Sequence, residues 1–441
     1  MLPFNRMYQL FRLFSDAAAR RKEAPFLHMS AGVNWLPACP SVLRCLHAEL
    51  DSALTYRNYG RSAGAFGVTD ALEQVEFALN AGQYRPAVTI TNGTTEGARL
   101  VFELLAASRS IQPGDTALMV GQGFPLYSLL SEAFGLEFKE VLSEFENPAK
   151  EYLPAMDRVL HSIETCRPKI VFLIIPNNPI GECYPEQDMS ALAQTCSSCG
   201  AVLLVDRVCL MPWDDYGASS RAFAPQIASG PCFFVDSFSK SESLAGLRTG
   251  FIVSNEAHRD TLVELTKARW LNPVVFSTMT LAYSRLAMLA NDSSEEVTSG
   301  LSNGLIDHLI HDCAAGDGGQ KVKDHFAEFC TEYRNDMAAR RKSISNNYKQ
   351  LCDRLGSTAI RPMKLDAGFN VALCLPTMLP VDEEADQRCL AEAHGVGVLT
   401  EMCFRSSTRT VGNYFARLGM TLPPDDFRQG LDAICEYYLS R

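Results

Sequence analysis

Short apolar runs alternate with segments of helical periodicity through the first two thirds of the chain. Residues 87–108 and 116–141 each begin as a strand, pass through a turn and continue as a helix with apolar periodicity, and 116–141 ends in a second strand. Residues 169–184 and 201–210 begin with unbroken apolar runs, which are typical of central strands buried on both faces. Strands and helices that alternate in this way predict a parallel sheet covered by helices.

The pattern changes after residue 290. Residues 291–324 are rich in Ser, Asp, Gly and Glu, and we interpret them as an insertion or mobile loop. A long charged helix is predicted from about 325 to 354. It is followed by candidates for three short strands and a closing helix, at 368–375, 395–400, 413–420 and 425–439.

These changes predict a division into domains. Residues 1–55 form an N-terminal arm that contributes to a small domain, and 56–290 form the large domain. The insertion at 291–324 separates it from the small C-terminal domain at 325–441. The first 22 residues are amphipathic and weakly similar to a transit peptide, but Asp16 favours an arm helix packed on the protein or on a partner subunit.

Polar residues stand where several predicted strands end. Gly93, Thr94 and Thr95 lie in a strand-to-helix turn, where backbone N–H groups and the helix dipole favour an anion. Asn178 lies between two prolines, so its amide is fixed at the sheet edge. Asp206 interrupts an apolar strand, and a buried carboxylate needs a partner such as a protonated nitrogen base. Because open α/β sheets bind ligands at this edge, the pattern predicts a binding site there.

The most unusual stretch is residues 236–253. It reads as a strand end, a serine-rich turn around Lys240, a second turn with Arg248 and another strand. One interpretation is a solvated loop. The other is that Lys240 forms a Schiff base with an aldehyde cofactor while Arg248 binds the phosphate of that cofactor. The polar strand ends elsewhere in the chain favour the second interpretation.

Taken in order, these segments resemble the fold-type I pyridoxal-phosphate enzymes, and among them the class I/II aminotransferase family. The motif SxSKxxxxxGxR, formed by Ser237, Lys240, Gly246 and Arg248, carries the resemblance most specifically, and NNPxG at 177–181 supports it. The resemblance implies an α/β fold: a large domain with a mostly parallel seven-stranded sheet flanked by helices, and a smaller α+β domain. It implies pyridoxal 5'-phosphate as the cofactor and an aminotransferase that acts on an α-amino acid and a 2-oxo acid, in amino-acid metabolism or biosynthesis.

The resemblance also assigns roles to single residues. Lys240 and Asp206 are implied as catalytic, Lys240 through the Schiff base and Asp206 through the protonated pyridine nitrogen. The other cofactor-binding residues would contact the phosphate, the ring or its phenolic oxygen, and they are Gly93, Thr94, Thr95, Phe124, Asn178, Ser237 and Arg248.

The substrate carboxylate is implied to bind Arg417, because a planar guanidinium can hold a carboxylate with two hydrogen bonds. Gly32 and Asn178 are the other implied substrate-binding residues. Arg405 and Arg409 remain alternatives to Arg417, since the sequence around Arg417 matches the family only loosely.

Family members are usually homodimers in which a tyrosine of one subunit reaches the phosphate in the other. Tyr59 is the candidate here, with Tyr56 as the second choice. The net charge of −11 argues against a nucleic-acid or anionic-membrane partner. Fifteen scattered cysteines are typical of an intracellular protein and predict a cytoplasmic location, and neither they nor the single CxxC at 196–199 predict a metal site.

Three further features depart from the family. Cys209 stands where a tyrosine commonly contacts the phenolic oxygen, and Arg207 stands where a glutamate is usual. The insertion at 291–324 is also atypical. These departures leave open a second reaction on the same cofactor: elimination, replacement, cyclisation or oxidation of an amino acid or of S-adenosylmethionine. A non-enzymatic member of the family is a third hypothesis, which retention of Lys240 and Asp206 opposes.

Overall fold

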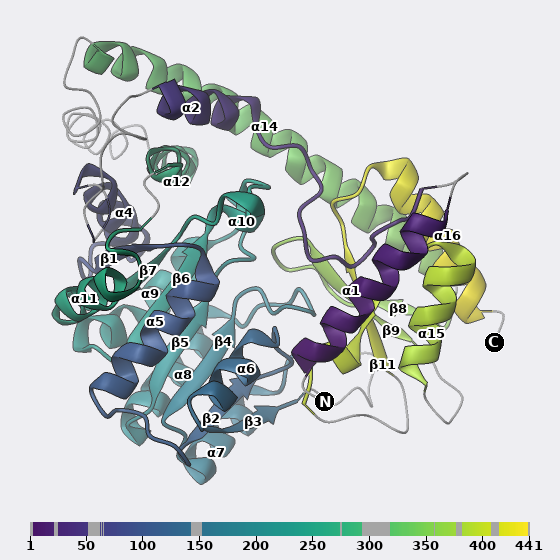
Figure 1. Ribbon diagram of the computed structural model, residues 1–441, viewed down its shortest axis with the longest axis horizontal. Helices are drawn as coiled ribbons and strands as arrows, with labels where there is room; N and C mark the ends of the chain where they lie inside the picture. Colours follow the sequence, from purple (N-terminus) through teal and green to yellow (C-terminus); the bar gives the residue numbers. More distant parts are fainter. Residues whose placement is uncertain are drawn as a thin grey trace. The chain divides into compact units, whose positions relative to one another are not determined.

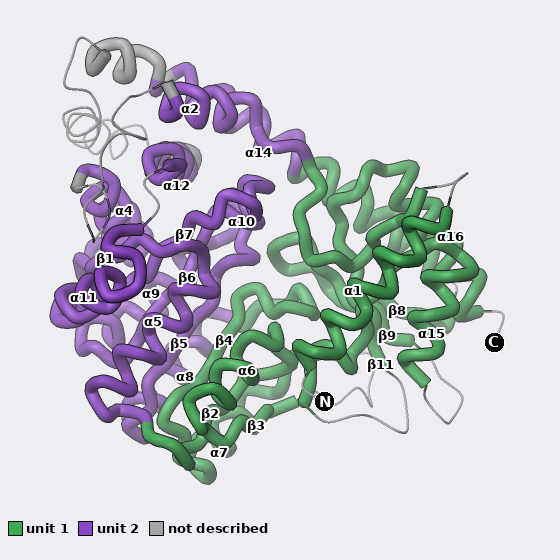
Figure 2. The backbone as a smooth tube through the Cα atoms, viewed as in Figure 1, with its two compact units in different colours: residues 1–36, 112–184, 341–441 green, residues 37–111, 185–340 purple. Residues whose placement is uncertain are grey.

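The structure is a computed structural model of the 441-residue chain. The residues that it describes are 3–21, 25–51, 62, 64, 66–142, 152–273, 276–292, 318–356, 358–375, 382–406 and 414–439. Figure 2 shows two compact units. The first comprises residues 1–36, 112–184 and 341–441, and the second comprises residues 37–111 and 185–340.

The second unit contains four strands in the order β1-β7-β6-β5. Strand β7 is antiparallel to both of its neighbours, whereas β5 and β6 are parallel. Every residue of β1, β6 and β7 is buried, which agrees with the unbroken apolar runs in the sequence. The strands are β1 (Ala87–Thr91), β5 (Val202–Asp206), β6 (Cys232–Ser237) and β7 (Gly250–Ser254).

Helices cover both faces of these strands (Figure 1). Helix α5 (Thr94–Ala107) packs on β1, β6 and β7, and a Cβ atom added at Gly97 would lie 3.4 Å from the side chain of Val235. The ring of Phe234, the preceding residue, instead meets Phe223 of α9 (Tyr216–Ser229). Since neighbouring residues of a strand point to opposite faces, α5 and α9 lie on opposite sides of the sheet.

The remaining helices of the second unit complete these layers. Helix α11 lies beside α5, and α4 and α8 lie beside α9. Helix α14 contributes to both units, because the boundary between them falls after Arg340. These elements are α2 (Pro40–Asp51), α4 (Phe66–Leu79), α8 (Glu186–Cys199), α10 (Phe238–Ser241), α11 (Arg259–Trp270), α12 (Thr278–Asp292) and α14 (Gly318–Leu355), with single 3-10 turns at Ala245–Leu247 and Glu256–His258.

The first unit contains a parallel group of strands and a separate antiparallel sheet. In the parallel group, β2 lies between β3 and β4. The antiparallel sheet has the order β10-β11-β9-β8. The strands are β2 (Thr116–Val120), β3 (Glu137–Val141), β4 (Ile170–Ile174), β8 (Arg361–Pro362), β9 (Asn370–Leu375), β10 (Leu399–Thr400) and β11 (Tyr414–Gly419). The helices are α1 (Pro3–Arg20), α6 (Leu126–Ala133), α7 (Met156–Cys166), α15 (Glu383–Cys389) and α16 (Pro424–Leu439), with a π-helical turn at Leu390–His394 and a 3-10 turn at Glu401–Cys403.

The predicted fold class is confirmed. Strands β1 to β7 form one mostly parallel sheet in the order β1-β7-β6-β5-β4-β2-β3, and a smaller α+β part follows the long helix. The N-terminal arm is a helix whose apolar face, including Met7, Leu10 and Phe14, is buried in the core of the first unit. The long helix begins at Gly318, a few residues before the predicted start. Among the described helices, none has a stretch apolar and long enough to span a bilayer.

Candidate active site

The predicted site residues fall into two groups, one in each unit, and each group is described by itself. In the second unit, strand β6 runs directly into the single helical turn α10, which carries Lys240. The Ser237 hydroxyl caps this turn by accepting a hydrogen bond from the backbone N–H of Ser239 at 3.2 Å. Phe238 is fully buried and Lys240 is half-buried. The turn therefore holds the lysine at the carboxyl end of a central strand.

A cradle for an anion lies beside this turn. Gly93 precedes α5 with φ of 84°, and a Cβ atom at this position would lie 2.8 Å from Nη2 of Arg248. Gly250, which pairs with Ser237 in the sheet, allows the same close approach, since its Cβ atom would lie 2.9 Å from the Gly93 Cα. The first residues of α5 are Thr94 and Thr95. Ser237, the α5 N-terminus and the exposed Arg248 guanidinium thus meet at one edge of the sheet, as a phosphate site requires.

Asp206 is the last residue of β5 and is 4% exposed. It pairs with Val235, two residues before Ser237, and therefore lies on the α5 face of the sheet. Its Oδ1 accepts a hydrogen bond from the backbone N–H of Val208 at 2.9 Å. Cys209 follows in the same turn and is buried. The structure therefore brings Asp206 to the same face and edge as the phosphate cradle.

The first unit brings together Arg417, Asn178 and Gly32. Arg417 lies on β11 and is 2% exposed. Its Nη1 donates to Asn178 Oδ1 at 2.8 Å, and its Nη2 donates to the carbonyl oxygen of Ser30 at 2.6 Å. Gly32 has φ of 65°, and a Cβ atom there would lie 2.8 Å from Nη2 of Arg417. These contacts orient the guanidinium, and Phe404 lies under it with its ring centre 4.9 Å away.

The remaining predicted residues belong to neither of these two groups of described contacts. Phe124 is half-buried and packs against the core of the first unit. Arg405 donates to Glu401 Oε1 at 2.5 Å, so this alternative to Arg417 is engaged in an ion pair of its own unit. Arg409, Tyr56 and Tyr59 lie outside the described residues.

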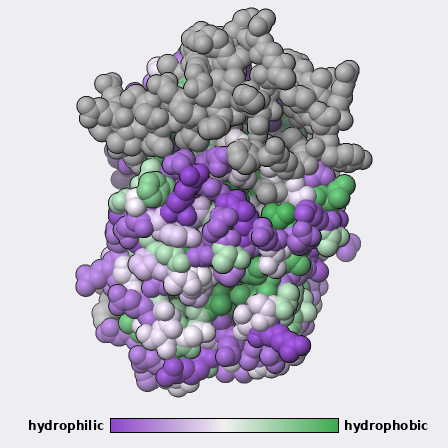
Figure 3. Space-filling view, turned by 90° about the vertical axis from the view of Figure 1, so that its left-hand side faces the viewer, coloured by the Kyte–Doolittle hydropathy of each residue, from purple (hydrophilic) through white to green (hydrophobic). Residues whose placement is uncertain are grey.

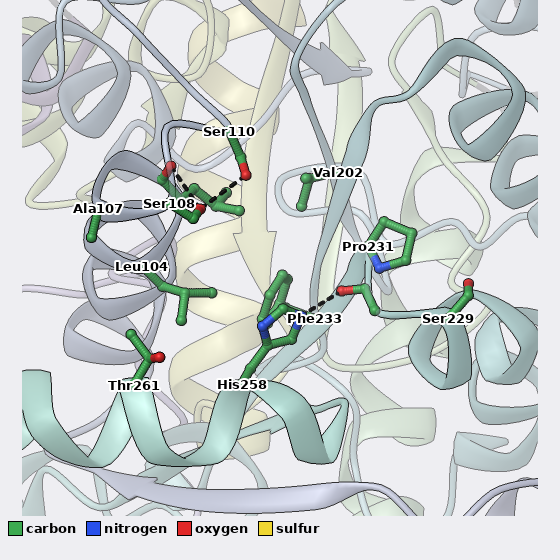
Figure 4. Close-up of a pocket in the computed structure, with 12 residues that line it drawn as sticks. Leu104, Ala107, Ser108, Ser110, Val202, Ser229, Pro231, Phe233, His258 and Thr261 are labelled. Carbon is green, nitrogen blue, oxygen red and sulfur yellow. Dashed lines mark hydrogen bonds between the residues drawn. The ribbon is translucent and has the colours of Figure 1, made fainter.

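A pocket of about 620 Å³ lies elsewhere on the second unit (Figure 4). It is lined by residues at the C-terminal end of α5 and at the start of β6, including Leu104 and Phe233. His258 borders it, and its Nε2 is 2.9 Å from the carbonyl oxygen of Gly230. Because β6 reaches Lys240 only at its other end, this pocket is separate from the lysine chemistry.

Two sets of contacts escape prediction from the sequence. Ser30 holds the Arg417 guanidinium, and its position two residues before Gly32 is the only signal for it. The sequence marks Arg207 as an extra cation but gives it no purpose. It is fully buried and pairs with Glu76, an acid in an otherwise largely buried helix. The signal that could have found this pair is an arginine directly after an apolar run, Arg207, together with an acid on an apolar helix face, Glu76, because two such buried charges need each other as partners.

The sheet order and the lysine-bearing turn have the architecture of the fold-type I pyridoxal-phosphate enzymes. The chain belongs to the family "Aminotransferase class I and II", whose model matches residues 26–302. Among curated proteins it is 24% identical over 249 residues to a probable aspartate/prephenate aminotransferase of Aquifex aeolicus, covering 56% of this chain and 59% of that protein. It is 25% identical over 253 residues to histidinol-phosphate aminotransferase 2 of Hydrogenovibrio crunogenus, covering 57% and 61%. The chain thus spans about three fifths of the length of these two relatives.

Solved structures agree on the fold. An aminotransferase from Mycobacterium tuberculosis matches with a TM-score of 0.72 at 22% identity, covering 99% of this chain and 97% of that chain. A Thermus thermophilus aspartate aminotransferase mutant matches with a TM-score of 0.68 at 18% identity, covering 96% and 98%. Family membership implies pyridoxal 5'-phosphate as the cofactor. The described residues fit this group, because the Gly93 cradle suits its phosphate and the buried Asp206 suits its pyridine nitrogen.

Proposed function

We propose that this protein is an aminotransferase that moves an amino group between an α-amino acid and a 2-oxo acid with Lys240 as the catalytic lysine. The observation that carries the proposal is the placement of Lys240 in a turn capped by Ser237, at the sheet edge where Gly93 and Arg248 approach each other. Bound pyridoxal phosphate supplies an electron sink that stabilises negative charge at the substrate Cα.

The residues of the second unit support four tasks. Lys240 binds the cofactor and then moves the proton at the substrate Cα. Asp206 keeps the pyridine nitrogen protonated, and its burial strengthens that charge interaction. The phosphate is held by the α5 N-terminus at Gly93, Thr94 and Thr95 together with Ser237 and Arg248. These groups would hold the phosphate in place while Lys240 moves the proton.

The residues of the first unit support the binding of substrate and ring. Arg417, held by Asn178 and Ser30, is proposed to bind the substrate carboxylate, with the Gly32 backbone beside it. Asn178 is also proposed to donate to the phenolic oxygen of the cofactor, and Phe124 to stack on its ring. The substrates named for the two relatives, aspartate or prephenate and histidinol phosphate, all carry an anionic group, which an arginine such as Arg417 suits.

The test is to mix the cofactor-loaded enzyme with single amino acids in the absence of any oxo acid. Transamination predicts that a substrate shifts the visible absorbance once, in proportion to the enzyme, and releases one equivalent of oxo acid. Continuous product release without an oxo acid would instead identify the elimination, replacement or cyclisation chemistry that Cys209 left open. Lys240→Ala should lose both the cofactor band and turnover, and activity retained in that variant would overturn the assignment of the lysine.

We also propose a homodimer in which Tyr59 reaches the phosphate of the partner subunit. Trp270 and Leu271, at the end of α11, are consecutive large apolar side chains that are 58% and 61% exposed, and adjacent exposed apolar side chains favour an interaction surface. Figure 3 shows the side of the molecule on which α11 and α4 lie, and hydrophobic side chains gather there among polar ones.

A cytoplasmic location stays a prediction, supported by the fourteen described cysteines, all of which are free thiols.

A further inference from the structure

Four charged side chains are buried together on the face of the second unit's sheet opposite α5. They are Glu76 of α4, Arg207 after β5, Asp236 of β6 and Arg285 of α12, and each is at most 5% exposed. We call this group the buried ion cluster. Two arginines and two carboxylates give it no net charge, which is the condition under which such groups can be held in a protein interior.

The four side chains form a continuous chain of contacts. Arg207 donates twice to Glu76, with Nη2 to Oε1 at 2.5 Å and Nη1 to Oε2 at 3.2 Å. Arg207 Nη2 also lies 3.8 Å from Asp236 Oδ2, and Arg285 Nη2 donates to Asp236 Oδ1 at 3.0 Å. Burial raises the pKa of Asp236, while the charges of Arg285 and Arg207 oppose that shift. Removing one member would leave a buried charge without its partner.

The buried ion cluster also holds the turn that follows Asp206. Arg285 Nη1 donates to the Tyr216 hydroxyl at 2.7 Å, and that hydroxyl donates to the carbonyl oxygen of Leu210 at 3.0 Å. Leu210 directly follows Cys209. The turn is therefore held at its start through Arg207 and at its end through Tyr216.

The alternation of side chains along a strand links this cluster to the catalytic face. The Arg207 backbone N–H donates to the carbonyl oxygen of Val235 at 3.0 Å, which continues the pairing of β5 with β6. The Arg207 guanidinium lies 4.2 Å from the ring centre of Phe234, on the face away from α5. Since consecutive residues point to opposite faces, fixing Arg207 there directs Asp206 to the α5 face.

The same reasoning applies to β6. Asp236 is fixed in the buried ion cluster, and the next residue, Ser237, points to the α5 face, where it caps the Lys240 turn. The backbone N–H of Ser237 donates to Asp236 Oδ1 at 2.7 Å, so the carboxylate also fixes the strand end directly.

We propose that the buried ion cluster sets the directions of Asp206 and Ser237, and that Arg207 and Asp236 are positioning residues for the lysine chemistry. This inference rests on the proposed function, because positioning has meaning only for residues that contact the cofactor. Separating paired charges in a low-dielectric interior is costly, so the cluster resists small displacements of both strand ends. Displacements near 1 Å are enough to reduce catalysis by about 100-fold.

The test compares two double variants that each neutralise an ion pair of α4. Glu76→Gln/Arg207→Gln removes a pair of the buried ion cluster and leaves Asp236 with Arg285. Glu73→Gln/Arg259→Gln is the matched control, because Glu73 lies one turn away on the same helix and accepts from Arg259 at 2.6 Å. Three properties are measured: the rate at which the cofactor-free protein captures pyridoxal phosphate, the pH midpoint of the visible absorbance of the loaded enzyme, and kcat and KM.

The first double variant is expected to capture the cofactor at least about tenfold more slowly, to shift the pH midpoint and to lose kcat by about tenfold or more with little change in KM. The control is expected to match the wild type in all three. Equal capture rates and midpoints in both variants, with only stability reduced, would overturn the proposal. If the first variant does not fold, Arg207→Lys replaces it, and an unchanged capture rate there has the same meaning. A wild type that captures the cofactor but does not transaminate would refute the proposed function. In that case the capture rates of the two double variants would still decide whether the buried ion cluster positions the cofactor-binding residues.

Discussion

At the residue scale, the structure distinguishes Arg417, the arginine that the sequence favours for the substrate carboxylate, from its alternative Arg405. Arg417 contacts Asn178 and Ser30 and approaches Gly32, whereas Arg405 is paired with Glu401. A guanidinium already neutralised by a carboxylate is a poor receptor for a second one. The partners therefore favour Arg417 as the substrate arginine, as proposed.

Arg417→Lys should test this choice. Lysine keeps the charge but loses the planar fork, so kcat/KM for an amino acid should fall by about 100-fold while the absorbance of the bound cofactor is retained. Steady-state kinetics at varied amino-acid concentration give kcat/KM, and the visible spectrum of the enzyme without amino acid gives the absorbance of the bound cofactor. Arg405→Lys is the matched control and should change kcat/KM little. The reverse order of the two variants would assign the role to Arg405.

Gly93→Ala should weaken cofactor binding. Gly93 combines φ of 84° with ψ of 169°, a conformation that residues with a Cβ atom rarely adopt, and the new methyl group would meet Arg248. We expect the dissociation constant for pyridoxal phosphate to rise by about tenfold or more. Gly114→Ala provides the control, because Gly114 has φ of 91° but its added Cβ would have no atom of the described residues within 4 Å. The Gly114→Ala variant should lose stability without losing cofactor affinity. Equal losses of affinity in the two variants would contradict a phosphate site at Gly93.

At the element scale, Glu49 shows how two helices are joined. It lies on α2, and its carboxylate accepts hydrogen bonds at 2.5 Å from the backbone N–H groups of Ser277 and Thr280 at the start of α12. Burial is the largest influence on this group and raises its pKa to about 7 despite those hydrogen bonds. Helix α12 carries Arg285, so this contact anchors the helix that completes the buried ion cluster.

Glu49 should make folding stability depend on pH. An ordinary glutamate carboxyl has a pKa of 4.5, whereas the pKa of Glu49 in the folded protein is about 7, so the folded protein holds more protons between these pH values. Stability from this group is therefore highest at low pH and falls as pH rises through that window, by about 3 kcal/mol. Denaturant unfolding at pH 5 and pH 8 measures it. Glu49→Gln should remove that part of the difference, and an unchanged pH dependence would refute the raised pKa.

At the scale of the whole molecule, the exposed end of α11 predicts assembly. Trp270→Lys/Leu271→Lys should convert a dimer to a monomer, because charges placed in an apolar interface are costly to bury. Light scattering of the purified protein gives the mass directly. Tyr8→Lys on α1, where the native side chain is 64% exposed, is the control and should stay dimeric. A monomeric wild type would refute the homodimer.

Much of the fold follows from local pattern. Unbroken apolar runs predict the buried strands, and serine-rich composition predicts the turn around Lys240. The domain boundaries after residues 55, 290 and 324 stay predictions. Each compact unit is built from segments that are distant in the sequence. The composition along the chain does not indicate which distant segments pack together.

Local sequence is enough to predict which residue types stand at the strand ends, because hydrophobic periodicity and turn composition are local properties of the chain. Lys240, Asp206 and Gly93 stand out in this way. The contacts between distant residues come from the folded chain: Gly93 with Arg248, Arg417 with Asn178, and Arg207 with Glu76, which is 131 residues away. Charge pairing and close approach depend on distance in space, and chain separation carries little information about that distance.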